Sequence, residues 1–257
     1  RVEVIMYAPH NSQRLLGAKL DLEDAAVMVA AQSKYHFRIT DNPEDFAGAE
    51  AVLVSAGGTP SKEDYARAAE QGIDDRTVQG MFNIDIMQAF AQKMQNCPQA
   101  VIFVLSNPVD MMCNIIRKLL PTHQVYGLGC WLDTMRFRRE LWQLLRPSNS
   151  KLSPEDIKSY IIGHHNDTMF VWQKSLEGIP ASAQQIAKAL QKTRDRGLLI
   201  TQTAAKASVP QANTGSCWAP ALMVSKVLQA FINGKLFLPM NRNILPQESE
   251  ELAGAYV

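Results

Sequence analysis

The sequence predicts an α/β protein built on a doubly wound parallel sheet, and two observations carry this prediction. Short, continuous apolar runs that end in turn residues recur along the first half of the chain, at 2–7, 51–58 and 100–108. Segments with helical periodicity separate them, at about 15–31, 81–94 and 111–119. Continuous apolar runs are typical of parallel strands covered on both faces, and their alternation with helices indicates βαβ units.

The second half of the chain follows a different pattern, which predicts a second domain of the α+β type. We expect a periodic helix over 134–145 and a strand over 159–165 that ends in two histidines. Two further helices are expected over 183–203 and 219–233, followed by a strand-like run at 234–240. We place the domain boundary at 126/127, which divides the chain into 1–126 and 127–257.

Composition excludes several classes of function. The 257 residues carry 26 Lys and Arg against 25 Asp and Glu, which leaves no basic surface for nucleic acid or an anionic membrane. No run of about 18 apolar residues occurs, so no membrane span is expected. The four cysteines stand far apart without a CxxC pair, which predicts reduced thiols, no metal site and a cytoplasmic location.

Polar and glycine-rich residues follow two of the predicted strands. Ser55, Ala56 and Gly57 come after one strand, and Asn107 comes after another, where Pro108 stops it. Ligands of open parallel sheets bind at the carboxyl ends of the strands, and glycine lets a backbone approach a ligand closely. These residues are candidates for a binding crevice, although tight turns have the same composition.

A sharper constellation combines Asp133, Arg136 and His165. The first two lie three residues apart at the start of a predicted helix, so both side chains can project from one face. Reduction of a 2-keto acid needs a guanidinium for the carboxylate, a histidine for the proton and a carboxylate that orients the histidine. A surface ion pair and a structural histidine would give the same local pattern.

The order of the motifs strengthens this interpretation. VLVSAGG, MFNIDI, SNPVD, GLGCWLDTMRFR and IIGHHNDT follow one another along residues 2–232 and together resemble the NAD-dependent lactate/malate dehydrogenase family. The resemblance implies a Rossmann-type domain followed by a catalytic domain, and hydride transfer between NAD and a small 2-hydroxy or 2-keto acid, with NADP left open. It also implies a homodimer or homotetramer. The predicted helix at 15–31 is either a subunit contact or core-facing.

The resemblance assigns a role to each matching residue. His165 falls on the catalytic acid/base, Asp133 on the residue that orients it and Arg136 on the arginine that binds the substrate carboxylate. Asn107 matches the asparagine beside the nicotinamide and the substrate carbonyl, and Ser216 matches a position near the substrate. The surrounding GSCWAPA looks closer to the pattern of some malate dehydrogenases than to that of the lactate enzymes.

The resemblance implies that Ser55, Ala56 and Gly57 lie beneath the dinucleotide. It also assigns Tyr7 to the position where NAD enzymes have an acidic residue that binds the ribose hydroxyls. Ala8 is the alternative for that position. The family's G-x-G-x-x-G motif precedes the strand that matches residues 2–7, so we expect a first strand and a glycine loop outside the given sequence. At the other end, we also expect a C-terminal segment outside it. Asn166 and Thr168 replace the family's glycine and serine after the catalytic histidine.

The substrate loop departs most from the family. The segment from 59 to 83 is roughly nine residues longer than the family pattern, which allows it to be helical with a partner or substrate of its own. Arg76 lies at the family spacing and is our choice for the arginine that polarises the carbonyl, with Arg67 as the rival. Glu70 occupies the position that sets substrate specificity, where it would repel a second carboxylate.

Two functional hypotheses follow. The first is an NAD(P)-dependent 2-hydroxy acid dehydrogenase. The second is a family member with altered or lost catalysis that acts as a binding or regulatory protein. The lack of an acidic residue at the ribose position and the lengthened loop favour this second hypothesis. The presence of Asp133, Arg136 and His165 together argues for the enzyme.

Overall fold

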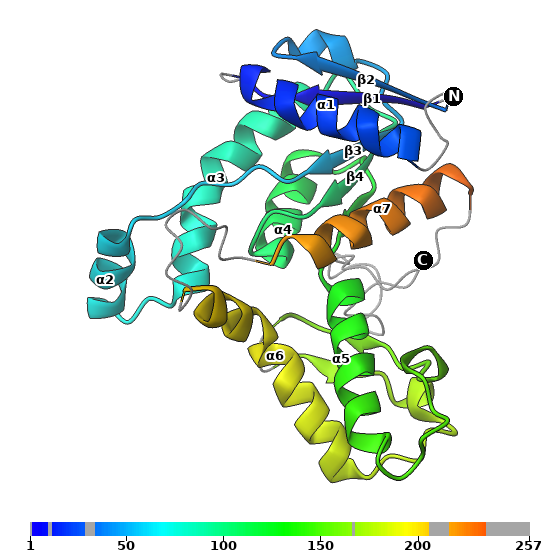
Figure 1. The fold of residues 1–257 in the computed structure, drawn as a ribbon. Coiled ribbons are helices and arrows are strands. Elements are labelled where there is room, and N and C mark those ends of the chain that lie inside the picture. Colours follow the sequence, from blue (N-terminus) through cyan, green and yellow to red (C-terminus); the bar gives the residue numbers. More distant parts are fainter. Residues whose placement is uncertain (1, 10–11, 29–33, 166–167, 206–215, 235–257) are drawn as a thin grey trace.

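The computed structural model describes residues 2–9, 12–28, 34–165, 168–205 and 216–234 (Figure 1). The predicted strand-like run at 234–240 lies almost wholly outside this part of the chain, as does Asn166. No helix in the described ranges is both long enough and apolar enough to cross a membrane.

Five parallel strands make up the first half and confirm the predicted α/β class. Strands β1 (Val2–Tyr7) and β2 (Tyr35–Thr40) pair along their whole length. A second sheet has the order β3-β4-β5, formed by Ala51–Val54, Val101–Val104 and Val125–Gly127. Continuous apolar runs do not indicate β2 or β5. YHFRIT alternates polar with apolar residues, which is typical of a half-buried strand, and VYG is only three residues long.

Helices connect these strands as expected for βαβ units. Helix α1 (Ser12–Met28) joins β1 to β2, α3 (Asp75–Met94) precedes β4, and α4 (Val109–Leu119) joins β4 to β5. Helix α3 begins earlier than the predicted 81, because the Asp74 side chain accepts hydrogen bonds from the first backbone N–H groups and caps the helix.

The long segment after β3 contains a helix of its own. The predicted strand at 51–58 ends at Val54, and the chain then runs to α2 (Lys62–Glu70). A reciprocal capping box between Ser61 and Asp64 starts α2. α2 stands at the far end of α3, away from the sheets, so the helical alternative for this loop is confirmed (Figure 1).

The second half packs mainly around α5 (Cys130–Leu145). A short antiparallel pair, β6 (Ile161–Ile162) and β7 (Phe170–Val171), and the long helix α6 (Ala183–Ala205) lie against it. Only two residues of the predicted strand at 159–165 pair, because the chain turns at Gly163 with a φ of 92°. The 3-10 helices are Pro43–Phe46, Pro154–Asp156 and Gln173–Leu176.

Helix α7 (Trp218–Ile232) returns to the sheet. Its Met223 and Val227 are buried against Phe103 of β4 and Tyr126 of β5. A separate core in the other half is built on Phe137 of α5 with residues of β6, β7 and α6. Helix α7 of the second half therefore packs on strands β4 and β5. The domain boundary at 126/127 stays a prediction.

The buried phenylalanine of α5 should contribute strongly to stability. Phe137 is fully buried, and Phe170 on β7 is 47% exposed. We expect Phe137→Ala to lower the free energy of unfolding by about 3–5 kcal/mol, because it leaves a cavity in a packed core. Phe170→Ala should cost about 1 kcal/mol or less. Urea denaturation of both variants measures the difference, and equal losses would contradict this assignment of the core.

Candidate active site

A buried amide on α3 ties together the carboxyl ends of β3 and β4. The Gly58 backbone N–H donates to Asn83 Oδ1 at 2.7 Å, and Asn83 Nδ2 donates to the Asn107 carbonyl at 2.5 Å. Ser106 Oγ adds a hydrogen bond to the Ala56 carbonyl at 2.5 Å. Sequence reasoning used Asn83, within MFNIDI, only as the reference for the spacing of Arg76 and gave it no role. Its position on the buried stripe of α3 was the available signal.

The residues predicted to contact a cofactor lie at these strand ends. Ser55, Ala56, Gly57 and Asn107 are exposed there. Exposed backbone held by a buried amide provides a pre-formed edge for a ligand.

Tyr7 lies at the end of β1 and is half-buried. Its ring packs edge-on against Phe46 with the ring centroids 5.2 Å apart. Burial raises the pKa of the Tyr7 hydroxyl, and the Asp41 carboxylate raises it further. Asp41 follows Thr40, the residue of β2 that pairs with Tyr7, so an acidic residue lies near the end of β1, which the sequence alone did not indicate.

One side-chain contact joins the first turn of α4 to the segment after β6. His164 Nδ1 lies 2.7 Å from Asp110 Oδ2. Asp110 follows Asn107 by three residues, and His164 immediately precedes His165. The contact therefore links the β4 strand end to the segment that carries the predicted acid/base.

The structure brings Asp133, Arg136 and His165 together. His165 Nδ1 lies 2.8 Å from Asp133 Oδ2, and Arg136 Nη1 lies 3.5 Å from Asp133 Oδ1. Only 8% of the Asp133 side chain and 14% of that of Arg136 are exposed, against 26% for His165. Burial lowers the pKa of the Arg136 guanidinium, and Asp133 opposes this shift.

The remaining predicted site residues are spread more widely. Ser216 is half-buried, two residues before α7. Arg76 is exposed in the first turn of α3, and Arg67 is exposed on α2, where it pairs with Asp64 at 2.8 Å. Within the described ranges, no hydrogen bond or ion pair joins either arginine to Asp133, Arg136 or His165.

Three of the four cysteines are buried and all four are free, as the sequence predicts. The Cys130 thiol donates to the Gly163 carbonyl at 3.6 Å. Burial raises the pKa of the Cys113 and Cys130 thiols, which keeps them protonated and unreactive. Across the described residues, no group of three or more His, Cys, Asp or Glu side chains is arranged to hold a metal ion.

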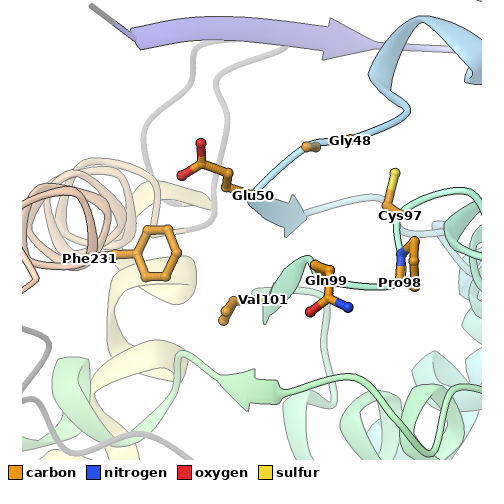
Figure 2. Close-up of a pocket in the computed structure, with 8 residues that line it drawn as sticks. Gly48, Glu50, Cys97, Pro98, Gln99, Val101 and Phe231 are labelled. Atoms are coloured by element: carbon orange, nitrogen blue, oxygen red, sulfur yellow. The ribbon is translucent and has the colours of Figure 1, made fainter.

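A depression of about 410 Å³ lies at the opposite end of the sheet from these residues. Figure 2 shows around it Gly48 and Glu50 before β3, Cys97, Pro98 and Gln99 before β4, Val101 at the start of β4, and Phe231 of α7. These are the amino ends of the strands, so the depression is separate from the candidate active site.

Comparison with known proteins agrees with this geometry. Residues 3–127 match the family model described as lactate/malate dehydrogenase, NAD binding domain. The chain is thus similar to the lactate/malate dehydrogenase family over the NAD-binding domain and beyond it. It is 28% identical to malate dehydrogenase of Francisella tularensis subsp. novicida over 247 residues, covering 93% of this chain and 70% of the relative.

Solved structures of the family share the fold. Malate dehydrogenase from Plasmodium falciparum matches with a TM-score of 0.73 at 23% identity, over 95% of this chain and 74% of that protein. Lactate dehydrogenase from Eimeria maxima, solved with NADH and oxamate, matches with a TM-score of 0.74 at 19% identity, over 99% and 73%. The predicted Rossmann-type fold is confirmed.

The turn at Gly163 should be essential for the geometry at His165. A Cβ at this position would lie 2.5 Å from the Thr168 carbonyl oxygen, in addition to the positive φ. We expect Gly163→Ala to cost at least about 2 kcal/mol in unfolding free energy and to lower any His165-dependent turnover.

Gly178→Ala is the matched control, because Gly178 also has a positive φ, of 76°, but nothing lies within 4 Å of the added Cβ. Its cost should be about 1 kcal/mol. Thermal unfolding of the two variants gives the comparison. A Gly163→Ala protein as stable as the control would show that the segment around His165 adapts.

Proposed function

We propose that this chain is an NAD-dependent dehydrogenase that interconverts a small 2-hydroxy acid and the corresponding 2-keto acid. The observation that carries the proposal is the buried Asp133 carboxylate, which is shared by the ring of His165 and the guanidinium of Arg136. This arrangement places a proton donor beside a carboxylate-binding group. A binding protein has no physical need for both, so the regulatory alternative is not favoured.

Each residue has a defined task in this reaction. Asp133 accepts the hydrogen bond from His165 Nδ1, which leaves Nε2 as the ring nitrogen that gives a proton to the carbonyl oxygen and takes it back in the reverse direction. Arg136 binds the substrate carboxylate, for which a guanidinium offers two parallel donors. The bound nicotinamide supplies the hydride or accepts it.

The residues present fit the nicotinamide end of the cofactor. The Asn107 side chain and the backbone of Ser55, Ala56 and Gly57 are exposed at adjoining strand ends, where a flat, hydrogen-bonding ring can lie against them. The given sequence contains no G-x-G-x-x-G, so we assign no residue to the pyrophosphate.

Asp41 near Tyr7 favours NAD over NADP. Asp41 follows Thr40, which pairs with Tyr7 in the parallel ladder, and this places a carboxylate close to the end of β1. A negative charge at this point would repel a 2′-phosphate and can accept hydrogen bonds from ribose hydroxyls.

The segment with α2 and the start of α3 takes the place of the family's substrate loop. We assign the carbonyl-polarising role to Arg76, because Arg67 is engaged with Asp64 on its own helix. Arg76 is exposed in this structure, so the segment must move toward His165 when substrate binds.

We also propose that the protein acts as a homodimer or homotetramer in the cytoplasm. Helix α1 exposes Leu16, Leu20, Val27 and Met28, the last at 85%. Apolar side chains gathered on one helix are typical of a contact between subunits. This supports the subunit-contact alternative for the predicted helix at 15–31.

Replacement of the acid/base tests the proposal directly. His165→Asn should lower kcat for NADH oxidation with a 2-keto acid by about 10²–10⁴-fold and leave NADH affinity unchanged, because the ring acts on the proton and not on the cofactor. Steady-state kinetics and NADH fluorescence titration measure the two effects.

The neighbouring His164→Asn is the control. It removes the contact with Asp110 but leaves the pair of His165 with Asp133, so its kcat should stay within about tenfold of wild type. Equal losses in the two variants, or full activity in His165→Asn, would refute the assignment.

The two loop arginines can be separated in the same assay. Arg76→Ala should lower kcat by about 10²-fold or more, since it removes a donor to the developing alkoxide. Arg67→Ala should change kcat less than about threefold, because this pair is exposed. The reverse ranking would transfer the role to Arg67.

A further inference from the structure

One side chain on α3 contacts both the chain after β3 and helix α2. Gln79 Nε2 donates to the Gly58 carbonyl at 2.7 Å, and Gln79 Oε1 accepts from the Tyr65 hydroxyl at 3.3 Å. The Gly58 carbonyl can only accept a hydrogen bond, so the amide nitrogen has to face it, which leaves the amide oxygen for Tyr65. Gln79 therefore joins the end of the β3 segment to the helix that follows it.

The Gly58 side of this connection is fixed. Asn83, one turn beyond Gln79 on α3, accepts from the Gly58 backbone N–H at 2.7 Å, so two side chains of one helix hold the donor and the acceptor of the same residue. A Cβ at Gly58 would lie 3.1 Å from the Phe82 carbonyl oxygen, which shows how closely this backbone approaches α3. Gln79 is thereby anchored to the edge of the candidate cofactor site.

Helix α3 consists of an exposed first turn and a packed remainder. Arg76 is exposed in the first turn, whereas Val78 and Gly80 are buried. Gln79 lies between these two buried residues. When the segment brings Arg76 toward His165, as the proposed reaction requires, the part that moves therefore ends before Val78.

Helix α2 has few other contacts that hold it. None of its residues is buried, and it stands at the far end of α3, away from the sheets (Figure 1). Within the described ranges, the bond from Tyr65 to Gln79 is the one side-chain hydrogen bond between α2 and α3. Partial burial raises the pKa of the Tyr65 hydroxyl and the Asp75 carboxylate raises it further, so the hydroxyl stays protonated and can donate. A single hydrogen bond has a large share in the local stability of such a helix.

We propose that Gln79 is a positioning residue for the substrate segment: its hydrogen bond with Tyr65 holds α2 in the position seen here, and this bond breaks when Arg76 approaches the substrate. The bond connects the part that moves to the part that stays, so it stabilises the free protein and opposes the bound position. This inference rests on the proposed dehydrogenase function for the role of Arg76, whereas the hold on α2 does not depend on it.

Tyr65→Phe tests the proposal, because it removes the hydroxyl and retains the ring. Exchange of the backbone amide hydrogens of 62–70 should become about two- to tenfold faster, as expected when one hydrogen bond no longer opposes local opening. The value of kcat/KM for pyruvate or oxaloacetate, whichever wild type reduces faster, should rise by a similar factor. The free enzyme then lacks a stabilising bond that the transition state never contained. Loss of a merely structural contact would not raise kcat/KM.

Tyr126→Phe is the matched control. The Tyr126 hydroxyl donates to Gln124 Oε1 at 3.1 Å, so this variant removes a tyrosine–glutamine hydrogen bond of the same kind at β5. Exchange of 62–70 and kcat/KM should both stay within about 1.5-fold of wild type. Thermal unfolding of each variant should show that it is folded.

Gln79→Met retains an unbranched side chain and removes both hydrogen bonds of the amide. It should accelerate exchange of 62–70 as Tyr65→Phe does, and combining the two substitutions should add less than about 1.5-fold, because the same bond is already absent. NADH affinity, measured by fluorescence titration, should fall by about threefold or more in Gln79→Met and stay unchanged in Tyr65→Phe. Only the first variant frees the Gly58 carbonyl.

Unchanged exchange of 62–70 in Tyr65→Phe would overturn the proposal, and so would a full further increase in the double variant. Faster exchange with a kcat/KM that stays at the wild-type value or falls would also overturn it, since the bond would then not oppose the bound position. If wild type reduces neither acid, the dehydrogenase proposal fails, and the exchange rates alone decide whether Gln79 holds α2.

Discussion

The Asp133 carboxylate is the group around which this site is organised. A buried carboxylate is unfavourable unless its oxygens have partners, and here one oxygen faces the ring of His165 and the other faces Arg136. Arg136 comes from the next turn of the same helix, whereas His165 comes from the chain after β6. Pairing this one carboxylate therefore fixes where the chain after β6 meets α5, and it sets the proposed proton donor, His165, beside Arg136, the proposed carboxylate-binding group.

Several other features support this arrangement. Gly163 lets the chain turn at a positive φ immediately before the two histidines, and the contact of His164 with Asp110 holds the same segment against the start of α4. Asn83 joins the ends of β3 and β4, so the edge expected to meet the nicotinamide is fixed by a buried amide. The cofactor side and the substrate side are thereby connected through short polar contacts.

The polar face of α5 continues beyond this junction. Glu140 is one turn beyond Arg136, and Lys192 and Arg196 of α6 contact it at 3.5 and 3.6 Å. Arg136 lies on a packed helix and is largely buried, whereas Arg76, the arginine proposed for the carbonyl, is exposed in the first turn of α3. In the proposed reaction, the substrate carboxylate would therefore be bound by the packed part of the protein, and the carbonyl would be polarised from the exposed segment.

Much of this could be read from the sequence, because the relevant signals are local. Apolar runs separated by periodic helices predicted β1, β3 and β4, and the i, i+3 spacing placed Asp133 and Arg136 on one helix face, with the ordered motifs adding His165. Other features depend on residues distant in the chain. No local feature of the sequence indicates that Asn83 joins two strand ends or that Asp41 lies near Tyr7. Hydrogen bonds and charge interactions depend on separation in space, so only the tertiary structure decided these contacts, together with the capped helix α2 and the return of α7 to the sheet.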